Sequence, residues 1–304
     1  MGEPTITFNP EYSFEYAKCE EIAPAIRRVV ANNPSAFTFH GTGTFIVGED
    51  EVVIIDPGPD QDTHINAVLD AVAGCKVSHL LITHTHLDHS PAAAAVQRAT
   101  HAPTVGFGPH GSGMRDTTVV IEEGADFDFA PDIVVRDGDV IRNSESRFEC
   151  VYTPGHTSNH MCFAHHEQNA LFSGDHVMGW NTTIVSPPDG DMSDYINSLD
   201  KLLLRDDAIY YPTHGSPITD PQRYVRDLRE HRLARGEQIE ACLARHPMTV
   251  MELVEQLYQH LPRSMNGAAA RSVLATLLYL QSQSRVKSLG DDIEIAQWQS
   301  KQNN

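Results

Sequence analysis

The chain has 304 residues, of which 40% are hydrophobic, and it carries a formal net charge of −19 at pH 7. This length suits one large domain, or a domain with a smaller companion, and the apolar content is sufficient for a real core. The negative charge disfavours general binding to nucleic acids or to anionic membrane surfaces.

The cysteines and the first residues bear on the compartment. Five cysteines are scattered along the chain and none forms a CxxC pair, which indicates free thiols in a reducing compartment. The segment MGEPTITFNPEYSFEY has neither a basic start nor an apolar run, so we expect no signal peptide. No apolar stretch reaches the length of a membrane helix. We therefore expect a cytoplasmic protein without a membrane segment.

Strand and helix patterns are interleaved from about residue 44 to residue 215. Short apolar or alternating runs predict strands at residues 44–48, 51–56, 77–83, 102–108, 132–141, 147–153, 160–166, 169–175 and 208–215. Helical spacing occurs at residues 64–75, 90–99 and 195–204. Ser90 and Pro91 are suited to be the N-cap and the first residue of the second helix. Such a mixture predicts a sheet-based α/β core.

The pattern changes after about residue 220, where charged and amphipathic helices take over. Three helical segments and a hairpin are predicted at residues 223–245, 248–260, 267–286 and 286–298. Thr249 precedes Glu252 at the spacing of a capping box. We expect a catalytic domain at residues 1–220 and a winged-helix-like domain at residues 221–304, with a plain helical appendage as the alternative.

The segment THTHLDHS, residues 83–90, gathers metal-binding side chains at the end of a predicted strand. Residues two apart in an extended chain point the same way, so His84 and His86 can hold one ion together. Asp88 and His89 follow and can turn towards a second ion. Zinc and similar metals bind imidazole and carboxylate ligands of this kind.

Three other predicted strands end in further candidate ligands, which are His156, Asp175 and His214. Any one of them alone would be read as an ordinary loop residue. Seven candidates that all follow strand ends instead favour a site for two metal ions. Two such ions can share a hydroxide and polarise the oxygen of an electrophile, so no serine or cysteine nucleophile is required.

The ordered motifs HxHxDH, GH, SGD and THG resemble the signature of metallo-β-lactamase-fold hydrolases over about residues 35–216. The resemblance implies an αββα sandwich with the site at one edge of the two sheets. It implies two zinc ions, with iron or manganese as alternatives. It assigns the ligands as follows: the first metal to His84, His86 and His156, the second to Asp88, His89 and His214, and the bridge between them to Asp175.

The resemblance also suggests supporting roles. Asp56 matches the family's early aspartate, which supports the metal ligands without binding the metal itself. Asp88 is both a ligand and the candidate to orient the attacking water or accept its proton. His160 lies close enough in sequence to support a ligand. Met178 and Trp180, after the bridging aspartate, could line a substrate rim, although a plain surface loop explains them equally well.

The substrate is less clearly indicated. GTGTFIVG, GHTSNHM, FSGDHVMGWNTT and PTHG with the C-terminal domain resemble the group of beta-lactamase-like protein 2 and its bacterial relatives, which includes a single-strand-preferring endoribonuclease. Residues 1–220 carry a net charge of −21 and residues 221–304 a net charge of +2, and the arginines of RYVRDLREHRLARG alternate with acids, as on a solvated helix face. We therefore favour a small acyl substrate, such as a thioester, lactone, ester or lactam. Cleavage of single-stranded RNA, or a non-enzymatic binding module, are the alternatives, and a homodimer is compatible with the C-terminal helices.

Overall fold

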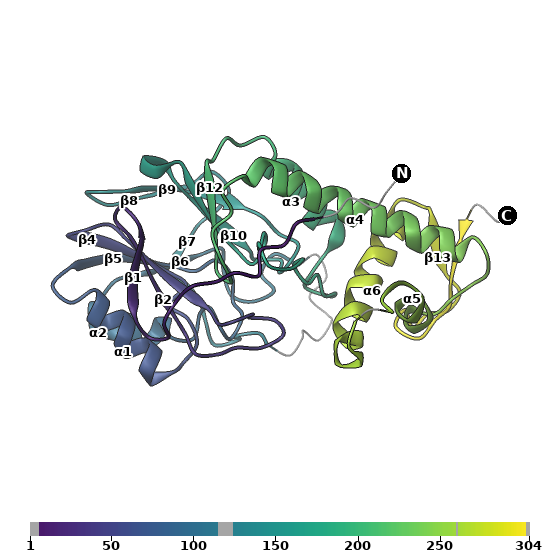
Figure 1. Cartoon of the computed structure of the whole chain (residues 1–304), viewed down its shortest axis with the longest axis horizontal. Helices are drawn as coiled ribbons and strands as arrows, with labels where there is room; N and C mark the ends of the chain where they lie inside the picture. Colours follow the sequence, from purple (N-terminus) through teal and green to yellow (C-terminus); the bar gives the residue numbers. More distant parts are fainter. Residues whose placement is uncertain (1–5, 115–123, 260, 302–304) are drawn as a thin grey trace.

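The computed structural model describes residues 6–114, 124–259 and 261–301, and its core consists of two β-sheets (Figure 1). The first sheet has seven strands in the order β1-β2-β3-β4-β5-β6-β7, and the second has five in the order β12-β11-β10-β9-β8. The strands of the first sheet are β1 (Cys19–Ala23), β2 (Ile26–Val30), β3 (Gly43–Val47), β4 (Glu51–Ile55), β5 (Lys76–Leu81), β6 (Thr104–Gly106) and β7 (Ile133–Val134). Those of the second are β8 (Val140–Arg142), β9 (Arg147–Tyr152), β10 (Met161–His165), β11 (Ala170–Gly174) and β12 (Ile209–Pro212).

The sheets pack face to face, and helices cover their outer faces. Phe45 of β3 belongs to the core between the sheets, where its ring lies 5.1 Å from that of Phe172 in β11. The next residue, Ile46, points to the opposite face and packs with α1 (Asp62–Ala71) and α2 (Ala93–Thr100). On the other side α3 (Met192–Leu202) packs on the second sheet through residues such as Tyr195. The arrangement is the predicted αββα sandwich.

Several elements differ from the sequence-based prediction. The β1–β2 hairpin was not expected. Residues 132–141 form two short strands in different sheets, because the chain turns at Gly138, which has a φ of +81°. Ser90 does not cap α2, which begins at Ala93; its hydroxyl donates to Asp126 Oδ2 at 2.6 Å instead.

The C-terminal elements form a winged-helix domain with its own core. They are α4 (Pro221–Leu243), α5 (Val250–Leu257), α6 (Asn266–Ser282), β13 (Val286–Ser288) and β14 (Trp298–Ser300). A short 3-10 turn at Arg263–Met265 lies between α5 and α6, and another, at His166–Gln168, lies between β10 and β11. The capping box of Thr249 and Glu252 is present at the start of α5, as predicted. Trp298 is fully buried among the helices, and β13 pairs antiparallel with β14 as the predicted hairpin.

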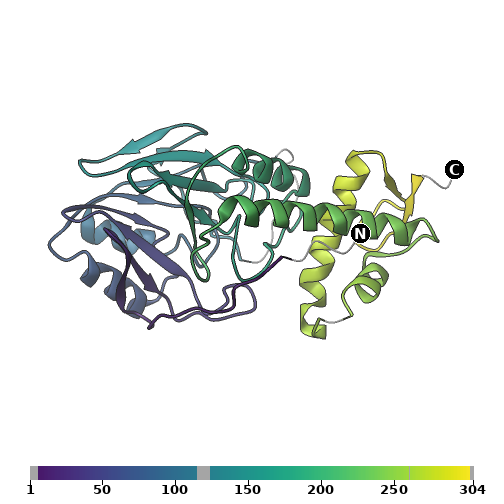
Figure 2. The same cartoon turned by 45° about the horizontal axis from the view of Figure 1, so that its top comes forward.

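The long helix α4 is shared between the two parts of the molecule (Figure 2). Near its start, Val225 and Leu228 pack into the same core as Tyr195 of α3. Near its end, Ile239 and Leu243 pack into the core of the winged-helix domain. No helix among the described residues is long and apolar enough to cross a membrane.

Candidate metal centre

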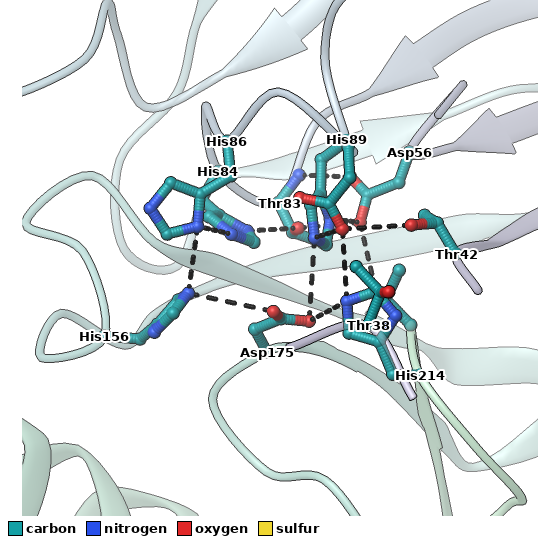
Figure 3. A network of polar contacts seen from close by, with 12 residues as sticks. Thr38, Thr42, Asp56, Thr83, His84, His86, His89, His156, Asp175 and His214 are labelled. Atoms are coloured by element: carbon teal, nitrogen blue, oxygen red, sulfur yellow. Dashed lines mark hydrogen bonds and ion pairs between the residues drawn. The ribbon is translucent and has the colours of Figure 1, made fainter. Parts of the chain in front are cut away.

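The predicted ligands come together because each follows a strand whose carboxyl end lies at the same edge of its sheet. His84 and His86 follow β5, which runs parallel to β4. Asp175 follows β11 and His214 follows β12, which are also parallel. His156 follows β9, which is antiparallel to the intervening β10 and so ends at that edge as well. Figure 3 shows these side chains converging from both sheets.

Three imidazoles form the first group of candidate ligands, which we name the first ligand group. His86 Nδ1 lies 2.9 Å from His84 Nε2 and 3.1 Å from His156 Nε2. Two ligand nitrogens bound tetrahedrally to one zinc ion would stand roughly 3.3 Å apart, since each lies about 2.0–2.1 Å from the metal. The spacing of the three nitrogens therefore fits one such ion.

The second ligand group consists of Asp88, His89 and His214. Asp88 Oδ2 lies 3.2 Å from His214 Nε2 and 3.3 Å from His89 Nε2. The ligand atoms of this group all lie within 4.8 Å of one another. The group again suits a single cation with mixed nitrogen and oxygen ligands.

Asp175 stands between the two groups. Its Oδ1 lies 3.4 Å from His214 Nε2 and 3.6 Å from His89 Nε2, while its Oδ2 lies 3.7 Å from His156 Nε2. Its Oδ1 and His89 Nε2 are buried and have no hydrogen-bond partner among the described residues. Buried polar atoms are normally satisfied, so these unpartnered atoms, facing each other in a cluster of ligands, fit a site that takes a metal ion.

Hydrogen bonds on the far side of the rings set the histidine tautomers. His156 Nδ1 lies 2.7 Å from the carbonyl oxygen of Ile184, and His214 Nδ1 lies 3.1 Å from that of Gly41. A carbonyl oxygen only accepts, so each Nδ1 carries a proton and Nε2 is the nitrogen that is left to bind a metal. Neither backbone partner was identified from the sequence.

Asp56 supports the second group and the preceding turn together. Its Oδ2 lies 2.9 Å from His89 Nδ1 and accepts the hydroxyl hydrogen of Thr83 at 2.7 Å. Its Oδ1 accepts the backbone N–H of Thr83 at 2.8 Å. Because the Thr83 hydroxyl is thus used as a donor, it can only accept from His84 Nδ1, 3.0 Å away. One buried carboxylate thereby orients a ligand of each group.

The second group is strongly charged when it binds no metal. Burial alone would raise the pKa of Asp88, but His89 and His214 outweigh burial and hold that pKa well below its usual value. Burial likewise opposes protonation of His214, yet Asp175 and Asp88 raise its pKa to about 10. The pKa of His84 is lowered, because burial and the neighbouring histidines all disfavour its charged form.

The remaining residues singled out from the sequence have diverse positions. His160 Nε2 accepts the backbone N–H of Asp175 at 3.2 Å, so it supports that ligand. The glycine before Asp175 is required, because a Cβ on Gly174 would lie 2.5 Å from the same nitrogen.

Met178 is only 4% exposed and offers little surface to a substrate. The half-buried Trp180 stacks on Phe39, with ring centroids 4.7 Å apart.

Solved structures and curated relatives resemble this chain over most of its length. A beta-lactamase domain protein from Burkholderia ambifaria has the same fold, with a TM-score of 0.77 at 20% sequence identity over 93% of this chain and 94% of that one. An atrochrysone carboxyl ACP thioesterase of Aspergillus chevalieri is 29% identical over 85% of this chain and 81% of its own length. A beta-lactamase-like protein 2 homolog of Caenorhabditis elegans is 28% identical over 85% of this chain and 84% of its own.

Two family models match the chain. Residues 249–298 match the beta-lactamase associated winged helix domain, which agrees with the fold of the C-terminal elements. Residues 38–214, more than half of the chain, match the model described as the metallo-beta-lactamase superfamily, and this range contains all the ligands described above. The chain therefore belongs to the metallo-beta-lactamase superfamily and carries that superfamily's associated winged-helix domain.

Proposed function

We propose that this protein is a hydrolase of acyl thioesters that uses zinc ions at both ligand groups. The observation that carries the proposal is the position of Asp175, whose two carboxylate oxygens face the histidines of the two groups. The acyl part of the proposal draws on the relatives named as ACP thioesterases. Iron or manganese would satisfy the same ligands.

The residues of the chain divide the work around the metals. Divalent ions bound here would lower the pKa of water to near neutrality and polarise a carbonyl oxygen. Thr42 donates its hydroxyl hydrogen to Asp88 Oδ2 at 2.9 Å and so holds that carboxylate in place. The Asp88 side chain is 23% exposed, so a substrate can approach it. We assign Asp88 the role of orienting the attacking water and accepting its proton.

Exposed apolar side chains occur on three segments that supply or contact the candidate ligands, and they favour an apolar acyl group. Leu87, between two ligands, is 53% exposed. Phe127 is 63% exposed and follows Asp126, whose backbone N–H donates to the carbonyl of Thr85 within the ligand segment. Phe37 is 56% exposed in the loop that also supplies Gly41. We name Phe37, Leu87 and Phe127 the apolar rim. A large apolar acyl group would remove their surface from water, which is favourable by roughly 25 cal/mol per Å².

RNA is the less favoured substrate on two counts. The catalytic domain, residues 1–220, carries a net charge of −21, which repels a polyanion. The side chains of the apolar rim also offer no charge to a phosphate. Binding of single-stranded RNA normally uses a basic groove together with stacking side chains.

The test is an assay of zinc-loaded protein on three substrates side by side: an aromatic acyl thioester, a lactone and a single-stranded RNA oligomer. The salt concentration is kept low, because attraction to RNA would then be strongest. We expect the highest kcat/KM on the thioester, and loss of that activity in His86→Ala. Efficient RNA cleavage that His86→Ala abolishes, with the acyl substrates untouched, would reverse the assignment.

A further inference from the structure

The loop that follows the bridging aspartate connects the ligands to the C-terminal helices. We name residues 176–190 the bridging loop. On the ligand side, the Thr183 hydroxyl donates to the backbone carbonyl of Asp175 at 2.6 Å. The carbonyl of Ile184, the next residue, accepts from Nδ1 of His156 at 2.7 Å. Two consecutive residues of this loop thus contact a ligand of the first group and the bridging ligand.

On its other side the bridging loop is held by α4 and α6. The guanidinium of Arg232, in α4, donates to the backbone carbonyl of Thr183. Tyr224, also in α4, donates its phenol hydrogen to the carbonyl of Met178 at 2.7 Å. Arg271, in α6, donates to the Ser186 hydroxyl at 3.2 Å. The helices therefore contact the same short segment that orients the ligands.

Arg232 is the central contact, and its burial is unusual for its charge. The residue is 8% exposed, and its Nε has no hydrogen-bond partner among the described residues. Its guanidinium lies over the ring of Tyr195, 5.3 Å from the centroid, and Tyr195 in turn donates to the carbonyl of His176 at 3.0 Å. Burying a guanidinium against only a carbonyl and a ring costs free energy. An apolar side chain of similar size would avoid that cost, so we expect the charge of Arg232 to have a role of its own.

We propose that Arg232 is a positioning residue for the metal centre, and that the winged-helix domain holds the ligands in place through it. Without the guanidinium, the carbonyl of Thr183 becomes a buried acceptor that lacks its partner. The loop can then regain a partner only by moving, which shifts Thr183 away from Asp175 and Ile184 away from His156. His156 loses the acceptor that keeps its proton on Nδ1 and its Nε2 free for the metal.

The test compares Arg232→Met with Arg229→Met on the same helix. Arg229 pairs with Asp200 of α3 and has no hydrogen bond to the bridging loop in the described part of the chain, so its loss controls for removal of a helix-surface arginine. Three quantities are measured: zinc affinity by competition with a chelator, the melting temperature of the metal-free protein, and amide hydrogen exchange of residues 176–190. Arg232→Lys serves as the conservative variant, because an ammonium can still donate to the Thr183 carbonyl.

We expect Arg232→Met to lower zinc affinity by about 10–100-fold, the range for loss of a group that orients metal ligands. Exchange in residues 176–190 should quicken, and Arg232→Lys should recover part of the affinity. Arg229→Met should leave zinc affinity unchanged even if it lowers the melting temperature. Equal zinc affinity in Arg232→Met and the unmodified protein would overturn the proposal.

A second variant keeps the proposal testable if Arg232→Met does not fold. Thr183→Val retains the shape of the side chain but removes the hydroxyl that donates to the Asp175 carbonyl, which is one of the two contacts by which the bridging loop holds the ligands. It should also lower zinc affinity, with Thr182→Val as the neighbouring control. Unchanged zinc affinity in Thr183→Val would overturn the proposal in its turn.

Discussion

Asp56 Oδ2 lies 2.9 Å from Nδ1 of His89, and both side chains are completely or almost completely buried. The pair joins the end of β4 to the second ligand group. Because the same carboxylate also accepts from the backbone and hydroxyl of Thr83, it is an acceptor in every direction. An uncharged amide of the same shape could not take its place, because its NH2 group would face at least one of the N–H or O–H groups that now donate to the carboxylate.

Asp56→Asn should therefore weaken zinc binding at the second group by about 10–100-fold, as expected when the group behind a ligand is lost. Zinc titration with a chelating competitor measures the effect. Asp207→Asn removes another buried carboxylate, which pairs with Arg205 away from the ligands. That control should alter stability but not zinc affinity, and an equal loss of affinity in both variants would contradict the role given to Asp56.

His86→Ala should remove zinc from the first group and lower kcat by orders of magnitude. The reason is that His86 Nδ1 lies about as far from the nitrogens of the other two imidazoles as two ligands of one zinc ion lie from each other. Zinc stoichiometry and turnover of a thioester are measured together. His246→Ala, an exposed histidine beyond the end of α4, is the control and should change neither quantity. Full turnover by His86→Ala would refute the ligand assignment.

Zinc affinity should rise with pH between about pH 6 and pH 9. In the metal-free protein Asp175 and Asp88, against the effect of burial, raise the pKa of His214 to about 10, so zinc must displace a proton from His214 throughout this range. The protons released can be measured by titration calorimetry in buffers of different ionisation enthalpy. Binding without proton release at pH 8 would contradict the prediction.

The raised pKa of His214 also predicts that the metal-free protein becomes less stable as pH rises. The folded pKa of His214 exceeds its ordinary value of about 6.5 in an unfolded chain. Its protonated form therefore contributes stability fully below that ordinary value, and the contribution is lost as pH rises towards 10. Denaturant unfolding of metal-free protein at pH 6 and pH 9 measures the difference, with His214→Asn as the variant that should reduce it.

Leu87→Ser and Phe127→Ser should lower kcat/KM for an aromatic acyl thioester more than for an acetyl thioester. Both side chains are more than half exposed beside the ligand segment, and a large acyl group would bury them while an acetyl group would not. Leu204→Ser is the control, since Leu204 is 90% exposed just beyond the C-terminal end of α3. Equal losses on both substrates would mean that the apolar rim does not contact the acyl group.

The sequence predicted that the candidate ligands come together, because each motif follows a strand and side-chain direction there is fixed by the backbone. It could not predict the partners of His156 and His214, because these are backbone carbonyls, which leave no residue-type signal. It also misplaced Arg232. The alternation of arginines and acids was interpreted as a solvated helix face, but α3 and the bridging loop cover Arg232 in three dimensions. A pattern along one helix cannot report what packs against it.

The sharing of α4 between two cores bears on how the chain is built during synthesis. Every candidate ligand precedes α4, so the ribosome has already incorporated all the candidate metal-binding residues when Pro221 is added. The outer face of α3 nevertheless lacks its cover until Val225 and Leu228 arrive, and Ala275 of α6 completes the same core more than 40 residues later. A nascent chain released early would hold the whole set of ligands without the scaffold that fixes them. The ability to load metal should thus be one of the last properties that the growing polypeptide acquires.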